Sequence, residues 1–236
     1  MTTLFFFGSL RDRELLEVVL GRPVSSEDRR GAVALGYQAR TLAAEAYPHL
    51  APTPGNRADG IVVSNLTAAD LDRLIYFEEA EYGLAPIDVQ TDAGVVSAQY
   101  FQATAKAVPT DDVWDFDAWT RTERDTALAA AEELMSHKGL VPLEEMDSIW
   151  PGVMIRAFMR ARAKSEKPVR GRLRGAWTRN DVQSISVTRP YTHYFAIEDH
   201  TLRHRRFDGS WSPEIRRTAL TSGDAVTVLP FDPLTL

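Results

Sequence analysis

The 236-residue sequence contains no cysteine, which excludes disulfide bonds, thiolate nucleophiles and metal centres built from cysteine. It also has no long apolar run: the N-terminal "MTTLFFFGSL" is too short for a signal peptide or a membrane span and has no basic stretch. A phosphate-binding GxxxxGK(S/T) loop and a Ser-His-Asp pattern are missing too. These absences favour a cytoplasmic protein without a membrane partner, and they indicate no metal or other cofactor.

The composition is that of a folded, acidic protein. Hydrophobic residues make up 44% of the chain and charged residues 25%, which suits one large domain or a medium domain with a small one. The formal net charge of −6 argues against nucleic acid as a partner. The exception is the basic stretch from Arg156 to Arg179. Either this stretch faces phosphate, or it is a solvated helix face that runs into a basic linker.

Alternating apolar residues predict a β-rich first half. The "LFFF" strand stops at Gly8-Ser9, and the amphipathic helix "RELLEVVLG" follows, with Ser9 and Asp12 placed as a capping box. Further strands are expected over residues 32–40, 58–66, 84–91 and 95–103, separated by turns such as 51–60 and 91–95. The pattern predicts an α+β fold whose largely antiparallel sheet is curled or barrel-like and carries a few helices.

The second half changes from helix to strand. From about Asp117 to Ala163 the chain is predicted to be helical, with one helix that stops at Gly139 and another that starts at Pro151. The polar, basic segment 163–175 is expected to be a linker. We therefore divide the chain into a domain of residues 1–165 and a β-rich region of residues 166–236. So small a sheet buries little surface and is expected to lean on a partner.

Residues 66–84, "LTAADLDRLIYFEEAEYGL", combine a helix, a turn and the start of a strand. Thr67 and Asp70 have the spacing of a capping box, so the helix is expected to begin near Ala68. An apolar stripe at the spacing of one helix face follows, formed by Leu71, Leu74 and Ile75. Continuing the stripe to i+7 reaches Glu78, an acid within an apolar arc.

Glu78 has two interpretations. Partial desolvation and the negative end of the helix are expected to raise its pKa, which is typical of a general base. Alternatively, the carboxylate bonds a backbone N–H group or pairs with an arginine, because perturbed acids are only probabilistic markers of sites. The sequence around Glu78 leaves both open.

The turn in "FFFGSL" is a second candidate site. A glycine and a small hydroxyl residue lie between a strand and a helix, so the N–H groups of Ser9, Leu10 and Arg11 are expected to point at an anion, such as a carboxylate or phosphate. A turn closed by a capping serine explains the same residues without a ligand.

Taken together, these two segments resemble the γ-glutamylcyclotransferase family in its AIG2-like branch. The resemblance rests on a first strand ending in (F/Y)-G-(S/T)-L and a later helix-borne acid in an F-E-x-x-x-Y context. It implies a mixed β-barrel with flanking helices and a pocket between the loop and the acid. Carried over residue by residue, it makes Glu78 the catalytic acid. It assigns the substrate-binding positions to Phe7, Gly8, Ser9, Leu10 and Tyr82.

The activity that the resemblance implies is release of 5-oxoproline and an amine or amino acid from a small γ-glutamyl substrate. Glu78 would act as general acid and base. Three positions depart from the family pattern: Glu79 stands for the usual glycine, Leu84 for an arginine, and Phe7 for a common tyrosine. A non-catalytic binding or assembly module stays open as the alternative.

The tail carries an independent resemblance. Its strands, up to "GDAVTVLPFDP", resemble the start of Nudix ADP-ribose pyrophosphatases, specifically in bacterial two-domain proteins associated with tellurite resistance. The resemblance implies that the C-terminal β segment can form a homodimer. The chain has no Nudix catalytic helix, whose glutamates hold Mg²⁺, so we expect no pyrophosphatase activity from it. We expect it to be a truncated part of a longer hydrolase.

Overall fold

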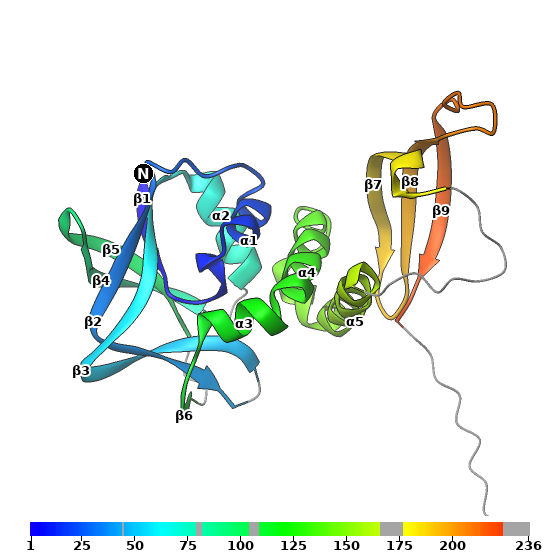
Figure 1. Cartoon of the computed structure of the whole chain (residues 1–236). Coiled ribbons are helices and arrows are strands. Elements are labelled where there is room, and N and C mark those ends of the chain that lie inside the picture. Colours follow the sequence, from blue (N-terminus) through cyan, green and yellow to red (C-terminus); the bar gives the residue numbers. More distant parts are fainter. Residues whose placement is uncertain (44, 79–81, 104–108, 166–176, 224–236) are drawn as a thin grey trace, which may run out of the picture. The chain divides into compact units, whose positions relative to one another are not determined.

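Figure 1 shows the chain as a computed structural model, which describes residues 1–43, 45–78, 82–103, 109–165 and 177–223. The chain divides into two compact units, Met1–Ser148 and Ile149–Leu236. The first unit contains β1 (Thr2–Phe6), η1 (Ser9–Arg11), α1 (Arg13–Leu20), β2 (Arg29–Leu42), β3 (Glu45–Leu66), α2 (Ala68–Glu78), β4 (Tyr82–Thr91), β5 (Gly94–Ala103), β6 (Pro109–Val113), α3 (Phe116–Thr122), α4 (Arg124–Ser136) and η2 (Leu143–Glu145).

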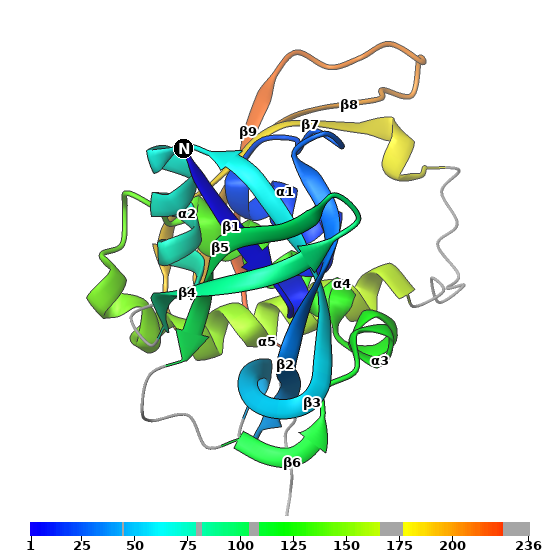
Figure 2. The ribbon, with the colours of Figure 1, turned by 90° about the vertical axis from the view of Figure 1, so that its left-hand side faces the viewer.

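The strands of the first unit form a closed barrel. Within the part of the chain that the structure describes, six strands follow the order β3-β1-β5-β4-β2-β6, and β2 also pairs with β3. This extra pairing closes β3, β1, β5, β4 and β2 on themselves. β1 and β5 are parallel, whereas the other pairings are antiparallel. Figure 2 shows the curled sheet, and the predicted mixed barrel with flanking helices is confirmed.

The segment 51–60, predicted to be a turn, is part of β3. β2 and β3 form a long antiparallel hairpin whose register shifts between the pair Leu35–Arg57 and the pair Tyr37–Pro52. The additional residues of β3 bulge around Gly55, whose φ of 87° suits glycine. The prolines and the glycine of this segment therefore mark a bulge inside a strand, and the turn prediction is wrong.

The barrel interior is filled by inward-facing side chains of all five strands. They are Phe5, Phe7, Ala32, Ala34, Leu50, Ala58, Val62, Ile87, Val89, Ala98 and Tyr100. Helices cover the outside: α1 contacts both α2 and α4 and buries its apolar residues, as the sequence predicts. In Figure 1 these three helices lie on one side of the strands.

Asp12, rather than Ser9, caps α1. The Asp12 carboxylate accepts the Leu15 N–H at 3.0 Å, and Arg124 of α4 donates to the same carboxylate at 2.7 Å. Ser9 lies earlier, in the 3₁₀ turn η1. The predicted capping box of Ser9 and Asp12 is therefore wrong, because a separate turn lies between β1 and α1.

The helical segment also differs in its boundaries. The helix predicted to stop at Gly139 is divided at Glu123 into α3 and α4, and Gly139, at a φ of 84°, lies in the turn after α4. The next helix, α5 (Met146–Ser165), starts before Pro151, which lies inside it. Met146 is buried and receives a hydrogen bond from the Tyr76 hydroxyl on its sulfur at 3.1 Å, which anchors the earlier start.

α2 begins at Ala68, as predicted, behind a capping box. The Thr67 hydroxyl accepts the Asp70 N–H at 3.1 Å, and the Asp70 carboxylate accepts the Thr67 N–H at 2.8 Å. Leu74 is fully buried, but Ile75 is 41% exposed, so the predicted apolar stripe is wrong at Ile75. The buried face is shifted because α2 packs against both α1 and α4.

Asp70 is a buried acid with a partner that the sequence does not reveal. Arg22 donates to both of its carboxylate oxygens, at 2.8 Å and 2.7 Å. The hydrogen bonds from Arg22, aided by those from Thr67, lower the pKa of Asp70 from 3.8 to about 2. Asp70 thus fixes the start of α2 and ties it to the segment after α1.

We expect Asp70→Asn to lower the free energy of unfolding by about 2 kcal/mol at pH 7, because one pKa unit corresponds to about 1.4 kcal/mol. Since the folded-state pKa is depressed, this stabilisation is present above pH 4 and is lost as the pH falls toward 2. Urea unfolding at several pH values measures it. The control is Asp72→Asn, which removes an exposed pair with Lys138 and should cost under about 1 kcal/mol. Equal losses in both variants, or a pH-independent difference, contradict the assignment.

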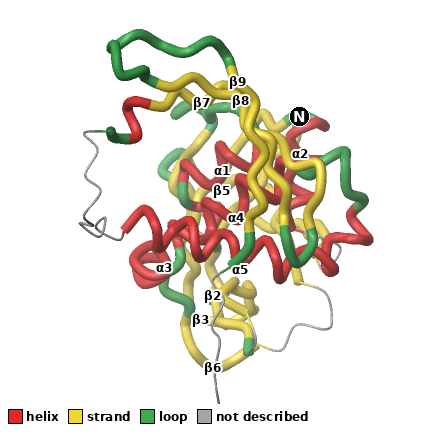
Figure 3. Tube along the Cα trace, turned by 90° about the vertical axis from the view of Figure 1, so that its right-hand side faces the viewer, coloured by secondary structure: helices red, strands yellow, loops and turns green. Residues whose placement is uncertain are grey.

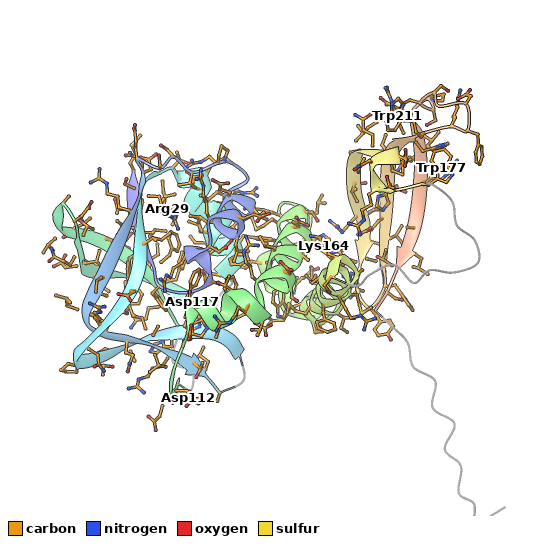
Figure 4. All side chains as sticks on the ribbon, in the orientation of Figure 1. Arg29, Asp112, Asp117, Lys164, Trp177 and Trp211 are labelled. Atoms are coloured by element: carbon orange, nitrogen blue, oxygen red, sulfur yellow. The ribbon has the colours of Figure 1, made fainter. Side chains whose placement is uncertain are left out.

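The second unit contains most of α5 together with η3 (Arg179–Asp181), β7 (Val182–Thr192), β8 (Ala196–His204) and β9 (Ile215–Thr221). In its described part, the strands form an antiparallel sheet in the order β7-β8-β9, visible as neighbouring yellow tubes in Figure 3. The hairpin-rich sheet predicted for the tail is present. Aromatic residues gather at the connection between β8 and β9. Trp177 contacts Phe207 there, and the Arg205 guanidinium lies over the Trp211 ring. Figure 4 labels both tryptophans.

Arginines of the basic stretch hold α5 to this sheet. Arg156 is 2% exposed and donates to the His193 carbonyl at 2.9 Å and to the Thr192 hydroxyl at 2.8 Å. Arg160 donates to Glu198 of β8 at 2.9 Å. Neither predicted role, phosphate contact or solvated helix face, fits these two side chains. These bonds also explain why the boundary between the two units lies before Ile149. The sequence instead suggests a boundary between residues 165 and 166. Most of the linker expected there lies outside the described residues.

Candidate active site

One end of the barrel brings the two candidate segments to the same level. Leu4 of β1 pairs with Gln99 of the parallel strand β5, so both strands finish at this end. β4 runs antiparallel to β5 and starts here, with Tyr82 opposite Ala103. The end of β1, which leads into the Gly8-Ser9 turn, and the start of β4 therefore lie at the same end of the barrel, with β5 between them.

Gly8 allows a sharp turn directly after β1. A Cβ atom at this position would lie 2.8 Å from Cγ of Pro48 in β3, too close for any larger residue without movement. The Arg11 N–H donates to the Gly8 carbonyl at 3.0 Å, so the prediction that it faces an anion is wrong. Among the described residues, the Ser9 and Leu10 N–H groups make no hydrogen bond. Both side chains are buried.

Glu78 is the last residue of α2 and is partly buried. It lies four residues after the fully buried Leu74, and four residues rotate an α-helix to within about 40° of the starting direction. Glu78 is thus on the buried side of α2, although its raised pKa and its role stay predictions. Glu79 and the side chain of Tyr82 lie outside the described residues.

Phe7 points into the barrel rather than toward the turn. Its ring meets the Tyr100 ring edge to face, with centroids 6.1 Å apart, and Tyr37 packs against the same cluster. Burial, reinforced by the nearby Tyr37, raises the pKa of Tyr100. In the sequence both tyrosines look like ordinary strand residues. The inward alternation of "VVSAQYFQA" is the signal that could have placed Tyr100 in the interior.

Two arginines lie beside the turn. Arg29 donates to the Arg11 carbonyl at 2.9 Å, and the Arg11 guanidinium lies 4.4 Å from the ring centroid of Phe116. Burial lowers the pKa of Arg11, while Asp59 and Asp117 oppose this shift. The Arg11 guanidinium stays charged at neutral pH and is faced by these two carboxylates as well as by Arg29. Figure 4 labels Arg29 and Asp117 near η1.

Within the described ranges, no cluster of three or more histidine or acidic side chains could hold a metal ion. His200 instead lies 3.1 Å from the Glu198 carboxylate, and Nδ1 of His204 lies 3.0 Å from the Arg205 carbonyl. No helix in these ranges is long and apolar enough to cross a membrane.

Comparison with known proteins identifies the family of the first unit. The family described as gamma-glutamyl cyclotransferase, AIG2-like, matches residues 4–121, which are 118 of the 236 residues. The chain belongs to this family. AIG2-like protein C of Arabidopsis thaliana is 26% identical over 140 residues, which cover 58% of this chain and 80% of that protein. A solution structure from Arabidopsis thaliana, at 22% identity and a TM-score of 0.42, covers 58% of this chain and 92% of that chain.

The chain also resembles a second kind of protein. An ADP-ribose pyrophosphatase of Escherichia coli strain K12 is 39% identical over 56 residues, which are 24% of this chain and 27% of that protein. This chain therefore spans about a quarter of the pyrophosphatase that it matches.

One departure from the cyclotransferase pattern has a clear position. Leu84, where the family has an arginine, pairs with Phe101 of β5. Its neighbour Ala85 packs against the barrel core, and because side chains alternate along a strand, Leu84 faces the opposite side of the sheet. Position 84 therefore supplies no cation to the barrel interior.

Proposed function

We propose that the chain is a γ-glutamyl cyclotransferase that releases 5-oxoproline and an amine or amino acid, with Glu78 as general acid and base. Family membership supports the reaction class. The observation that carries the proposal for the site is the strand register: β1 ends, and β4 begins, at the same end of the barrel. The Gly8-Ser9 turn and the segment that follows Glu78 adjoin these two strand ends.

The chemistry needs only one carboxylate. Glu78 accepts a proton from the α-ammonium group of the substrate, and the resulting amine attacks the γ-carbonyl carbon of the same molecule. The tetrahedral intermediate collapses as Glu78 returns the proton to the departing amine nitrogen. The γ-carbon–nitrogen bond breaks and Glu78 is again ionised. The ring nitrogen loses its second proton to the released amine, which leaves as an ammonium ion, and the lactam of 5-oxoproline is complete.

The turn supplies donors for the charge that develops. The N–H groups of Ser9 and Leu10 come from adjacent residues and are unused within the described part of the chain. Adjacent N–H groups suit a single oxygen, and such donors stabilise an oxyanion more than the ground-state carbonyl. We therefore assign them to the γ-carbonyl oxygen.

A panel of γ-glutamyl amino acids and γ-glutamyl amines tests the proposal. We expect 5-oxoproline and the free amine to form in equal amounts from at least one member, measured by chromatography with mass detection. α-Glutamyl isomers serve as the control, because their amine is attached to the α-carbonyl, so attack of the free α-amine on the γ-carbon cannot release it. Release from none of the γ-glutamyl compounds contradicts the proposal.

A second candidate is a non-catalytic assembly module for an ADP-ribose pyrophosphatase, which the 39% identity over 56 residues favours. In that case the β7-β9 sheet mediates a homodimer. Tyr191, Ile197 and Leu220 pair across the three strands, and Tyr191 and Leu220 are 51% and 70% exposed. Sedimentation equilibrium should then detect a dimer, and Leu220→Asp should dissociate it. The control is Val95→Asp, at a similarly exposed site in the barrel unit, which should leave the dimer intact.

A further inference from the structure

Two phenol groups inside the barrel have no role in the chemistry described so far. Tyr100 is 4% exposed and faces the interior from β5, and Tyr37 packs against the same cluster from β2. Within the described residues, neither hydroxyl makes a hydrogen bond. Neither hydroxyl is among the fully buried polar atoms that lack a partner, so both keep some exposure and are available to bond a ligand.

The phenols lie at the end of the barrel that carries the turn. Tyr100 pairs with Ala85 of β4, three positions from the end of the β4–β5 register at the pair Tyr82–Ala103. Phe7, the residue that precedes Gly8, contacts the Tyr100 ring at 6.1 Å between centroids. The two hydroxyl groups thus lie among the apolar side chains of the core cluster near the turn.

A γ-glutamyl substrate presents two groups that need donors, the γ-carbonyl and the α-carboxylate. The Ser9 and Leu10 N–H groups serve the first, and Leu84 faces away from the interior and carries no charge. A carboxylate has two oxygens and accepts hydrogen bonds from separate donors. Two hydroxyls contributed by different strands match this requirement, and bonds to a charged acceptor are stronger than neutral ones.

We propose that the Tyr37 and Tyr100 hydroxyls bind the α-carboxylate of the γ-glutamyl group and so restrict the substrate to γ-glutamyl compounds whose α-carboxylate is free. This inference rests on the proposed cyclotransferase function. Each phenol donates its proton to one carboxylate oxygen, and burial raises the pKa of Tyr100 further above its usual value, so the Tyr100 phenol stays protonated at neutral pH. Phe7 provides the apolar wall against which the substrate chain lies.

The test compares each γ-glutamyl substrate with its α-carboxamide in wild type, Tyr37→Phe and Tyr100→Phe. Phenylalanine keeps the ring in the core, so the fold is retained, and thermal melts check this. We expect KM for the carboxylate substrate to rise roughly 10- to 100-fold with kcat little changed, because each variant loses one bond to a charged group. The carboxamide should react poorly in all three proteins. Tyr194→Phe, at a residue that is 76% exposed in the second unit, should match wild type.

Calorimetric binding of 5-oxoproline and of its carboxamide separates this inference from the proposed function. Wild type should bind the acid, and both variants should lose most of that affinity, whether or not turnover is seen. Normal turnover and binding in both variants overturn the phenol site while the cyclotransferase stands. Wild type that binds 5-oxoproline and its carboxamide equally well also overturns it. Tyrosine-dependent binding without turnover keeps the phenol site and contradicts the reaction.

Discussion

Replacing Glu78 with glutamine is expected to lower the rate of 5-oxoproline release by about 10²- to 10⁴-fold, the usual contribution of general acid–base catalysis. Glutamine has nearly the same shape but neither accepts the proton of the α-ammonium group nor returns one to the leaving amine. Because the substrate-binding donors lie elsewhere, KM should change little. Steady-state kinetics with the best γ-glutamyl substrate measures both parameters.

Glu79→Gln is the matched control for this prediction. It removes a neighbouring carboxylate of the same sequence segment and should leave kcat within a few-fold of wild type. Circular dichroism checks that both variants fold, since Glu78 is the terminal residue of α2 and its replacement keeps the helix. A large loss in Glu79→Gln with an active Glu78→Gln would move the catalytic role to the neighbouring acid.

Gly60→Ala is expected to lower the free energy of unfolding by about 3 kcal/mol, the upper end of the usual cost of overpacking. A Cβ atom at Gly60 would lie 2.4 Å from the Phe5 ring and 2.4 Å from the Phe6 carbonyl oxygen. The backbone oxygen cannot move without disturbing the pairing of Phe6 with Ile61. The added methyl therefore forces β1 and β3 apart, which opens the barrel at the strand that leads into the candidate site.

The neighbouring strand offers a control for Gly60. Gly31 of β2 pairs with Ile61, and a Cβ atom there meets nothing within 4 Å. Gly31→Ala should be neutral or slightly stabilising in urea unfolding, because glycine is unfavourable in a strand. If the two variants unfold at the same urea concentration, the close approach of β1 and β3 does not restrict position 60 to glycine.

Local patterns in the sequence predict most of the fold. Alternation places the strands over 32–40, 58–66, 84–91 and 95–103 inside β2, β3, β4 and β5, and the capping box of Thr67 starts α2 at Ala68. The pairing of β2 with β3 and the bulge at Gly55 were not predictable, because proline and glycine indicate a turn unless the partner strand is known. Likewise, the contacts of Arg156 and Arg160 with β7, β8 and the turn between them show that α5 belongs with the C-terminal strands, and the sequence does not reveal these contacts.

Some features of the candidate site can likewise be predicted from the sequence, and others cannot. Glu78 and the Gly8-Leu10 turn can be found from their sequence context, because a polar residue in an apolar arc and a glycine between a strand and a helix are local signals. The use of the Arg11 N–H within the turn depends on three-dimensional geometry. Tyr37 and Tyr100 are far apart in the sequence and meet only because β2 and β5 both border β4 in the closed barrel.

Under the proposed function, the γ-glutamyl amide is cleaved by its own α-amine and not by water. The most direct measurement is the reaction of wild type with a γ-glutamyl substrate in ¹⁸O-labelled water, with mass analysis of 5-oxoproline, glutamate and the free amine. We expect unlabelled 5-oxoproline in an amount equal to the amine, and no glutamate. Glutamate carrying one ¹⁸O atom, or substrate that remains intact, would contradict it.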